Sequence, residues 1–160
     1  KLTWGSWTPH KFKIAVSGCP RNCAEATIKD LGIIGVDSGW EIHVAGNGGI
    51  KVRVTDFLCK VKTDEELFEM VKAYMQFYRE DAYYLERTAN WMERVGLEYV
   101  KEVLFDKEKR KMYADSFDIS QKSAQVDPWA KAIEDGFTKE FSPIVIDPND
   151  SHSFEAKEQI

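Results

Sequence analysis

The chain has 160 residues, the size of one compact domain, and 43% apolar and 31% charged residues predict a packed core. Its net charge of −5 argues against nucleic acid as a partner. No stretch approaches the roughly 20 apolar residues that span a bilayer, so we expect no membrane partner. Three cysteines without a visible secretory signal favour the reducing cytoplasm.

The charge is distributed unevenly along the chain. Residues 1–29 carry a net charge of +4, whereas the remaining residues carry −9. A basic segment in an acidic protein predicts a small anionic ligand near that segment. Chance clustering of a few lysines is the alternative.

Glycine and proline crowd the first fifty residues, which predicts short strands joined by tight turns. A short helical stretch is expected at 24–30, and hairpin turn chemistry at 37–39 and 46–49. The last three strands should therefore form an antiparallel meander. The strand patterns lie at 13–18, 31–36, 40–45 and 50–57.

A helical pattern begins at Thr63. Thr63 and Glu66 can form a capping box, and apolar residues follow at helical spacing. Gly96 suits the position after a helix that covers about 84–95, and Asp106 can cap a further helix. The aromatic residues of these helices predict a hydrophobic core, with docking of a partner as the alternative.

These patterns predict an α+β fold. We expect a small antiparallel sheet with a cysteine loop and a short helix, followed by a helical C-terminal region. The parts are placed at 1–62 for the sheet and cysteine loop and 63–130 for a helical region packed on it. Residues 131–160 are assigned to an extension that ends in a flexible tail.

The segment 17–26, SGCPRNCAEA, has the strongest chemical content. Cys19 and Cys23 lie four residues apart, so both sulfurs would face one side of a helical turn. Pro20 suits a first helical turn, whose free N–H groups and positive dipole end would favour thiolates. Iron–sulfur clusters need such ligands, usually four of them. This spacing also occurs in inert buried cysteines, and a zinc site completed by His10 is a further alternative.

Other candidate residues have structural interpretations. Cys59 lies in a strand-like run and is expected to pack in the core. Asp81, Glu86 and Arg87 are expected to form ion pairs on a helix surface.

Several segments resemble the sirohaem domain of NAD(P)H-dependent nitrite reductase large subunits, in the nitrite and sulfite reductase family. The resemblance covers about residues 4–130. Sulfite reductases and ferredoxin-dependent nitrite reductases share the cysteine motif and the glycine loop, but the helical stretch favours the NAD(P)H type. The similar segments lie, in the family's order, at 9–26, 28–35, 39–49, 57–63, 78–97 and 127–129.

The resemblance implies roles for individual residues. Cys19 and Cys23 match the second of two cysteine pairs that hold a [4Fe–4S] cluster, and the Cys23 sulfur would also bridge to the sirohaem iron. Gly46 and Asn47 match a loop that runs beside the sirohaem. Arg21 stands where many relatives have asparagine, and it is shared with the NAD(P)H type.

Sirohaem carries many carboxylates, so the resemblance implies a site lined by cations. The candidates are Lys11, Lys13 and Arg21, and Asn22 lies in the same loop. Cys23 and Arg21 are the residues expected to act at the reaction centre. Ala45 departs from the family, because many relatives have a second glycine there.

The implied enzyme is an oxidoreductase that reduces nitrite to ammonia with six electrons from NAD(P)H. Residues 1–62 would be the second half of its sirohaem and iron–sulfur lobe. The implied partners are nitrite, the upstream part of the same polypeptide with its FAD and NAD(P)H domains, and a small Rieske-like subunit. Because the first cysteine pair is missing here, we expect the isolated chain to be inactive. The alternatives are an assimilatory sulfite reductase relative and a stand-alone iron–sulfur electron carrier.

Overall fold

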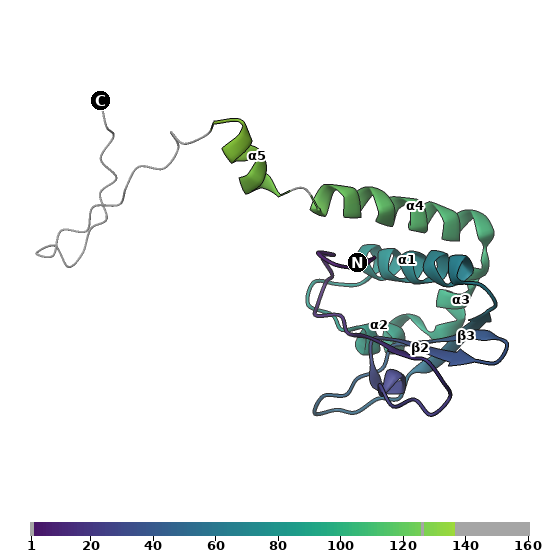
Figure 1. Cartoon of the computed structure of the whole chain (residues 1–160). Helices are drawn as coiled ribbons and strands as arrows, with labels where there is room; N and C mark the ends of the chain where they lie inside the picture. Colours follow the sequence, from purple (N-terminus) through teal and green to yellow (C-terminus); the bar gives the residue numbers. More distant parts are fainter. Residues whose placement is uncertain (1, 126, 137–160) are drawn as a thin grey trace, which may run out of the picture. The chain divides into compact units, whose positions relative to one another are not determined.

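The computed structural model describes residues 2–125 and 127–136 (Figure 1). The chain forms two compact units, Lys1–Ser123 and Ala124–Ile160. None of the helices in the described ranges is long and apolar enough to cross a membrane.

Four strands of the first unit form one sheet in the order β1-β2-β3-β4. The antiparallel meander expected for the last three strands is confirmed. β1 pairs with β2 in parallel, because residues 18–30 cross over the sheet between them. The strands are β1 (Ile14–Ser17), β2 (Leu31–Val36), β3 (Gly39–Val44) and β4 (Asp56–Val61).

The last strand begins later than the sequence pattern predicted. The expected strand at 50–57 is wrong, since β4 starts at Asp56. A loop forms instead, in which Asn47 N donates to Arg53 O at 2.9 Å and Arg53 N donates to Asn47 O at 2.8 Å. The Asn47 side chain also donates to Lys51 O at 2.8 Å, so it occupies a carbonyl that a longer strand would have paired.

One face of the sheet packs on the helices. Leu31 and Ile33 of β2 lie opposite Val44 and Ile42 of β3, and all four belong to the buried core. Leu58 of β4 joins the same core. Because side chains alternate along a strand, the intervening residues of β2 point to the other face.

The helical region confirms the expected α+β fold. Its helices begin at the residue that the sequence predicted, because the side chain of Thr63 accepts from Glu66 N and the Glu66 carboxylate accepts from Thr63 N. Asp106 also caps its helix as expected, accepting from the backbone of Glu108 and Lys109. The helices are α1 (Asp64–Asp81), α2 (Thr88–Val95), α3 (Leu97–Phe105), α4 (Lys107–Ala124) and α5 (Pro128–Glu134).

α2 is shorter than the helix expected over 84–95, although Gly96 ends it as predicted. Gly96 has a φ of 84°, which a glycine adopts without steric cost. The helix starts at Thr88 and not near residue 84, because the preceding loop is hydrogen-bonded to the N-terminal segment. Leu85 has a φ of 63° and its N–H donates to the carbonyl of Pro9 at 3.0 Å.

Aromatic side chains fill the core between the helices and the sheet, as expected. Trp91 lies among Tyr74, Phe77 and Tyr78, with ring centroids 5.3–6.0 Å apart. These side chains and Phe117 of α4 are at most 2% exposed. Full burial of one such side chain stabilises a fold by about 1.5–3 kcal/mol, so this cluster contributes several kcal/mol to the stability of the unit.

α4 runs alongside α1 (Figure 1). Arg110 Nε contacts Glu69 at 2.6 Å and Lys72 contacts Asp118 at 2.8 Å, which joins the two helices by half-exposed ion pairs. Since the core includes both sheet and helix residues, the sheet and α1–α4 belong to one folded unit.

The second unit contains α5. Pro128 opens this helix, and the side chain of Asp127 accepts from Trp129 N at 2.9 Å. Most of the extension assigned to 131–160, including its flexible tail, lies outside the described residues. The domain boundaries therefore stay predictions.

Candidate functional site

The cysteine loop lies in the crossover from β1 to β2, on the sheet face opposite the helices. Gly32 of β2 points to that face, and Ala26 packs directly on it. A Cβ at Gly32 would lie 2.2 Å from the carbonyl oxygen of Ala26, so only glycine allows this approach. Gly32 therefore sets how closely the loop sits on the sheet, a role that its sequence neighbours do not reveal.

The expected helical turn at the cysteines is wrong. The loop consists of turns, with Asn22 N donating to Cys19 O at 3.2 Å, and the 3₁₀ helix Ala26–Ile28 starts only after Cys23. Asn22 and Glu25 have φ values of 51° and 54°, which break any continuous helix. A helix dipole therefore does not favour thiolates at Cys19 and Cys23.

Asn22 explains why the loop is not helical. Its Oδ1 accepts from Ala26 N at 2.7 Å and from the hydroxyl of Ser17 at 3.2 Å, while its Nδ2 donates to Thr27 Oγ1 at 2.9 Å. Ser17 Oγ in turn accepts from Ala24 N at 3.2 Å. Such side-chain bonds compete with helical ones, and asparagine tolerates the left-handed backbone. Asn22 therefore holds the loop from within.

Cys19 and Cys23 are both exposed free thiols, as cluster ligands on an open lobe would be. Within the described ranges no third cysteine, histidine or carboxylate gathers beside them. The zinc site with His10 is therefore not formed, and His10 Nδ1 instead accepts from Lys11 N at 2.8 Å. Cys59 packs against the core as expected, and burial raises the pKa of its thiol to about 11.

The glycine loop is built tightly onto the end of the cysteine crossover. Gly46 N donates to Lys29 O and Ala45 N donates to Asp30 O, both at 2.9 Å. A Cβ at Gly46 would lie 2.6 Å from Lys29 O, so this glycine serves close packing within the chain. Ala45 has a φ of 62°, which gives a physical reason for glycine at this position in relatives. Asn47 closes the loop through its own side chain.

A small pocket brings part of the predicted site together. Its volume is about 70 Å³, and its wall contains Lys11 and Lys13 beside the loop from Asn47 to Gly49. Lys29 and Arg87 also line it, although no sequence pattern assigns them to the site. Arg21 is exposed in the cysteine loop and is not part of this wall. The basic segment 1–29 thus contributes three of its lysines to one pocket.

Arg87 corrects a further expectation. It does not form a helix-surface pair, because Arg87 Nη2 lies 3.1 Å from both carboxylate oxygens of the fully buried Asp30. Asp30 also accepts from Lys13 N at 2.9 Å and from the hydroxyl of Thr88. Glu86 forms an ion pair as expected, but from the loop before α2 and not from a helix surface; its carboxylate lies 2.8 Å from Arg94, which lowers the Glu86 pKa. The partners of Asp30 lie up to 58 residues away, so no local pattern could have identified them.

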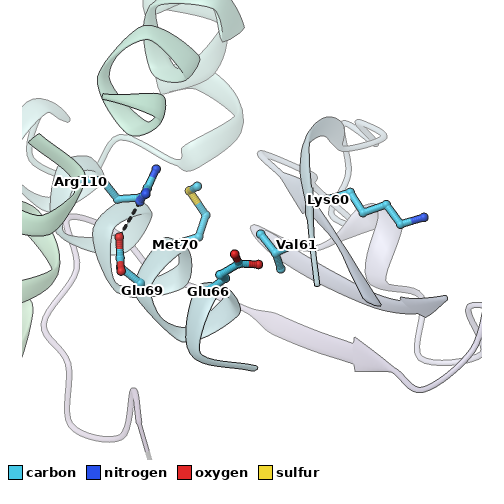
Figure 2. A pocket seen from close by; sticks show the side chains of 6 residues that line it. All are labelled: Lys60, Val61, Glu66, Glu69, Met70 and Arg110. Carbon is cyan, nitrogen blue, oxygen red and sulfur yellow. Dashed lines mark hydrogen bonds and ion pairs between the residues drawn. The ribbon is translucent and has the colours of Figure 1, made fainter. Parts of the chain in front are cut away.

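A second pocket, of about 190 Å³, lies between β4, α1 and α4 (Figure 2). Its charged groups are already engaged: Glu69 pairs with Arg110, and Glu66 accepts from the backbone of Lys62 at 2.9 Å. The ammonium group of Lys60 points away from the pocket in Figure 2. The cysteine loop and the small pocket lined by Lys11, Lys13, Lys29 and Arg87, called here the cationic pocket, are therefore the candidate functional site.

Known proteins are similar to this chain over most of its length. Residues 1–112 match the family described as nitrite and sulphite reductase 4Fe-4S domain. The chain is 56% identical to nitrite reductase [NAD(P)H] of Bacillus subtilis over 128 residues, which cover 80% of this chain and 16% of that protein. It is 45% identical to the nitrite reductase (NADH) large subunit of Escherichia coli over 104 residues, or 64% of this chain and 12% of that one.

An assimilatory-type sulfite reductase of Nitratidesulfovibrio vulgaris is 31% identical over 96 residues, which cover 60% of this chain and 44% of that protein. The chain thus spans less than a fifth of the two nitrite reductases it resembles. The matched region contains both cysteines, the glycine loop and all four strands. The chain belongs to the nitrite and sulphite reductase 4Fe-4S domain family.

Proposed function

We propose that this chain is part of an NAD(P)H-dependent nitrite reductase and supplies the second half of its sirohaem and [4Fe–4S] site. The observation that carries the proposal is a pair of exposed free thiols, Cys19 and Cys23, on a loop that side-chain bonds hold in place. Two thiolates are half of the usual ligand set of a cluster. The other half would come from the upstream part of the same polypeptide.

The residues of this chain suit the two groups chemically. Exposed thiols can be cluster ligands, and a lysine-lined pocket beside the glycine loop can accept carboxylates of a sirohaem. When bound, these groups supply electrons one at a time to a substrate held at iron. Cys19 and Cys23 would hold the cluster, with Cys23 shared between both groups. Arg21, exposed between them, would face nitrite or a sirohaem carboxylate.

The reaction proposed for the whole enzyme is the six-electron reduction of nitrite to ammonia. FAD and NAD(P)H on preceding domains would supply the electrons, and a small Rieske-like subunit is a further proposed partner. The greater identity to nitrite reductases than to the sulfite reductase supports nitrite as the substrate. Sulfite reduction is the second candidate, supported by that weaker relative.

The test is a chimaera in which this chain replaces the matching 128-residue segment of the Bacillus subtilis enzyme. We expect sirohaem absorbance and nitrite-dependent NAD(P)H oxidation, with slower turnover of sulfite. Cys23→Ser should abolish both cluster and sirohaem signals, whereas Cys19→Ser should damage the cluster first. Cys59→Ser is the matched control and should retain both signals. A Cys23→Ser chimaera with normal spectrum and turnover would contradict the proposal.

The stand-alone electron carrier is tested on the 160-residue chain itself. Anaerobic reconstitution with iron and sulfide should yield far less than one [4Fe–4S] cluster per chain, because only two ligands gather among the described residues. A stable stoichiometric cluster would favour the carrier. Arg21→Ala, tested in the chimaera, should raise the KM for nitrite or lower the sirohaem content.

A further inference from the structure

We propose that the cationic pocket binds a single carboxylate or another small oxyanion, and that Arg87 is the fixed part of its wall. The proposal deepens the proposed function and rests on it for the source of the anion. The size of the pocket, its charge and the hydrogen bonds of Arg87 support anion binding independently of the proposed function.

The size of the pocket admits one small group. Its volume is about 70 Å³, whereas pockets that hold drug-sized ligands measure about 300–1,000 Å³. A carboxylate or phosphate-sized oxyanion fits this space, whereas a tetrapyrrole ring does not. A ring could therefore reach the pocket only through one of its peripheral carboxylates.

The charge of the wall favours an anion. Among the described residues, the ammonium groups of Lys11 and Lys13 have no partner, and that of Lys29 contacts only the exposed Glu25, at 3.1 Å. Such an exposed pair contributes little and is easily exchanged for a better acceptor. Asp30 is the acidic residue of the wall, and its carboxylate is already saturated by donors. The wall is therefore positively charged overall.

Arg87 is oriented before any ligand arrives. Its side chain is 18% exposed, and both oxygens of the buried Asp30 hold it through Nη2. Within the described ranges its Nε, which is buried, and its Nη1 make no hydrogen bond. A guanidinium presents its donors as a rigid fork. Because Asp30 already holds this fork, binding of an anion does not cost the conformational entropy of the Arg87 side chain. The lysines supply further charge from flexible stems.

The test follows anion binding to the 160-residue chain by ¹H–¹⁵N NMR. Inorganic phosphate and uroporphyrin, a ring with carboxylate side chains, are titrated separately while the Arg87 Nε–H and the Gly48 and Gly49 amides are recorded. We expect saturable shifts at all three signals with at least one probe. Arg87→Lys keeps the positive charge beside Asp30 but removes the planar guanidinium with its several donors. This variant should weaken anion binding several-fold.

The decisive variant is Lys11→Gln with Lys13→Gln, because both residues are exposed and the fold does not depend on their charge. We expect binding at least ten-fold weaker. The control, Lys60→Gln with Lys62→Gln, removes the same charge from exposed residues outside this pocket and should bind as the wild type does. Equal weakening in both double variants, or unshifted Arg87 and glycine signals, would overturn the proposal.

The two probes separate the sources of the anion. Tighter binding of uroporphyrin, with displacement of phosphate, supports a tetrapyrrole carboxylate, whereas saturable binding of phosphate alone supports a free oxyanion. Failure here is distinct from failure of the proposed function. If the chimaera reduces nitrite but the chain binds neither probe, only the proposed anion binding by the pocket is overturned. If the chimaera is inactive but the chain binds a probe, only the proposed nitrite reductase function is overturned.

Discussion

The helical region and the cysteine crossover are held by different forces. Around Trp91, apolar side chains from α1, α2 and α4 are buried to 2% exposure or less, and the structure there depends on area removed from water. In the crossover, Cys19 and Cys23 are exposed, and the loop depends on polar bonds centred on Asn22. Stability and candidate chemistry thus lie in separate parts of one unit.

The difference has a physical reason. A buried aromatic cluster contributes several kcal/mol but leaves no reactive group exposed, whereas a hydrogen bond contributes about 0.5–1.5 kcal/mol and can position an exposed thiol. A loop held in this way is expected to open more readily than the core. Five substitutions or measurements test this contrast, from the largest effect to the smallest.

Trp91→Ala should have the largest effect on stability. The residue is fully buried, contacts three aromatic rings, and donates through Nε1 to Asp81 at 2.6 Å. We expect a loss of about 3–5 kcal/mol in the free energy of unfolding, measured by urea denaturation. Trp4→Ala, at a residue that is 76% exposed, is the control and should cost less than about 0.5 kcal/mol.

Gly32→Ala should displace the crossover from the sheet. The new Cβ would lie 2.2 Å from the backbone oxygen of Ala26, so the loop must move. A loss of about 1–3 kcal/mol is expected from such overpacking, with faster amide exchange in residues 19–28. Gly18→Ala is the matched control, because no atom lies within 4 Å of its built Cβ. Equal loss in both variants would show that Gly32 does not set this contact.

Two variants of Asn22 separate the contribution of its left-handed backbone from that of its side-chain hydrogen bonds. Asn22→Gly keeps the φ of 51° accessible but removes the side-chain bonds, so a loss of about 1 kcal/mol is expected. Asn22→Ala should cost more, because it also strains the backbone. Hydrogen exchange at the amides of Ala24 and Ala26 measures both. If the two variants behave alike, the left-handed conformation contributes nothing.

The three thiols should differ in reactivity without any change in fold. Burial raises the pKa of the Cys59 thiol from its ordinary value of 9.0 to about 11, so its reactive thiolate is scarce near pH 8. Iodoacetamide at pH 8 should modify the exposed Cys19 and Cys23 well before Cys59, as followed by mass spectrometry. Comparable rates at all three residues would show that the core opens as often as the loop.

The Cys59 thiol also predicts that the free energy of unfolding depends on pH. Because the folded state raises the pKa of Cys59, its contribution to stability is complete below pH 9 and is lost as the pH rises towards 11. Cys59→Ala should remove this part of the alkaline loss. Denaturant midpoints measured from pH 8 to 11 provide the comparison.

Sequence patterns alone were enough to predict the α+β class, the start of α1 at Thr63 and the end of α2 at Gly96. Those features depend on local signals, namely hydrophobic periodicity, side-chain caps and a helix-ending glycine. The family resemblance also identified the relatives that the comparisons then found.

The construction of the site depends on contacts that form only when the chain folds. The crossover is not helical because Asn22 bonds to Thr27 and Ala26, and Arg87 turns inward because Asp30 is buried beneath it. The ion pair joins residues 57 positions apart in the chain. A local pattern contains no information on such partners, since the cost of burying a carboxylate, and therefore its need for donors, arises only when the chain packs around it.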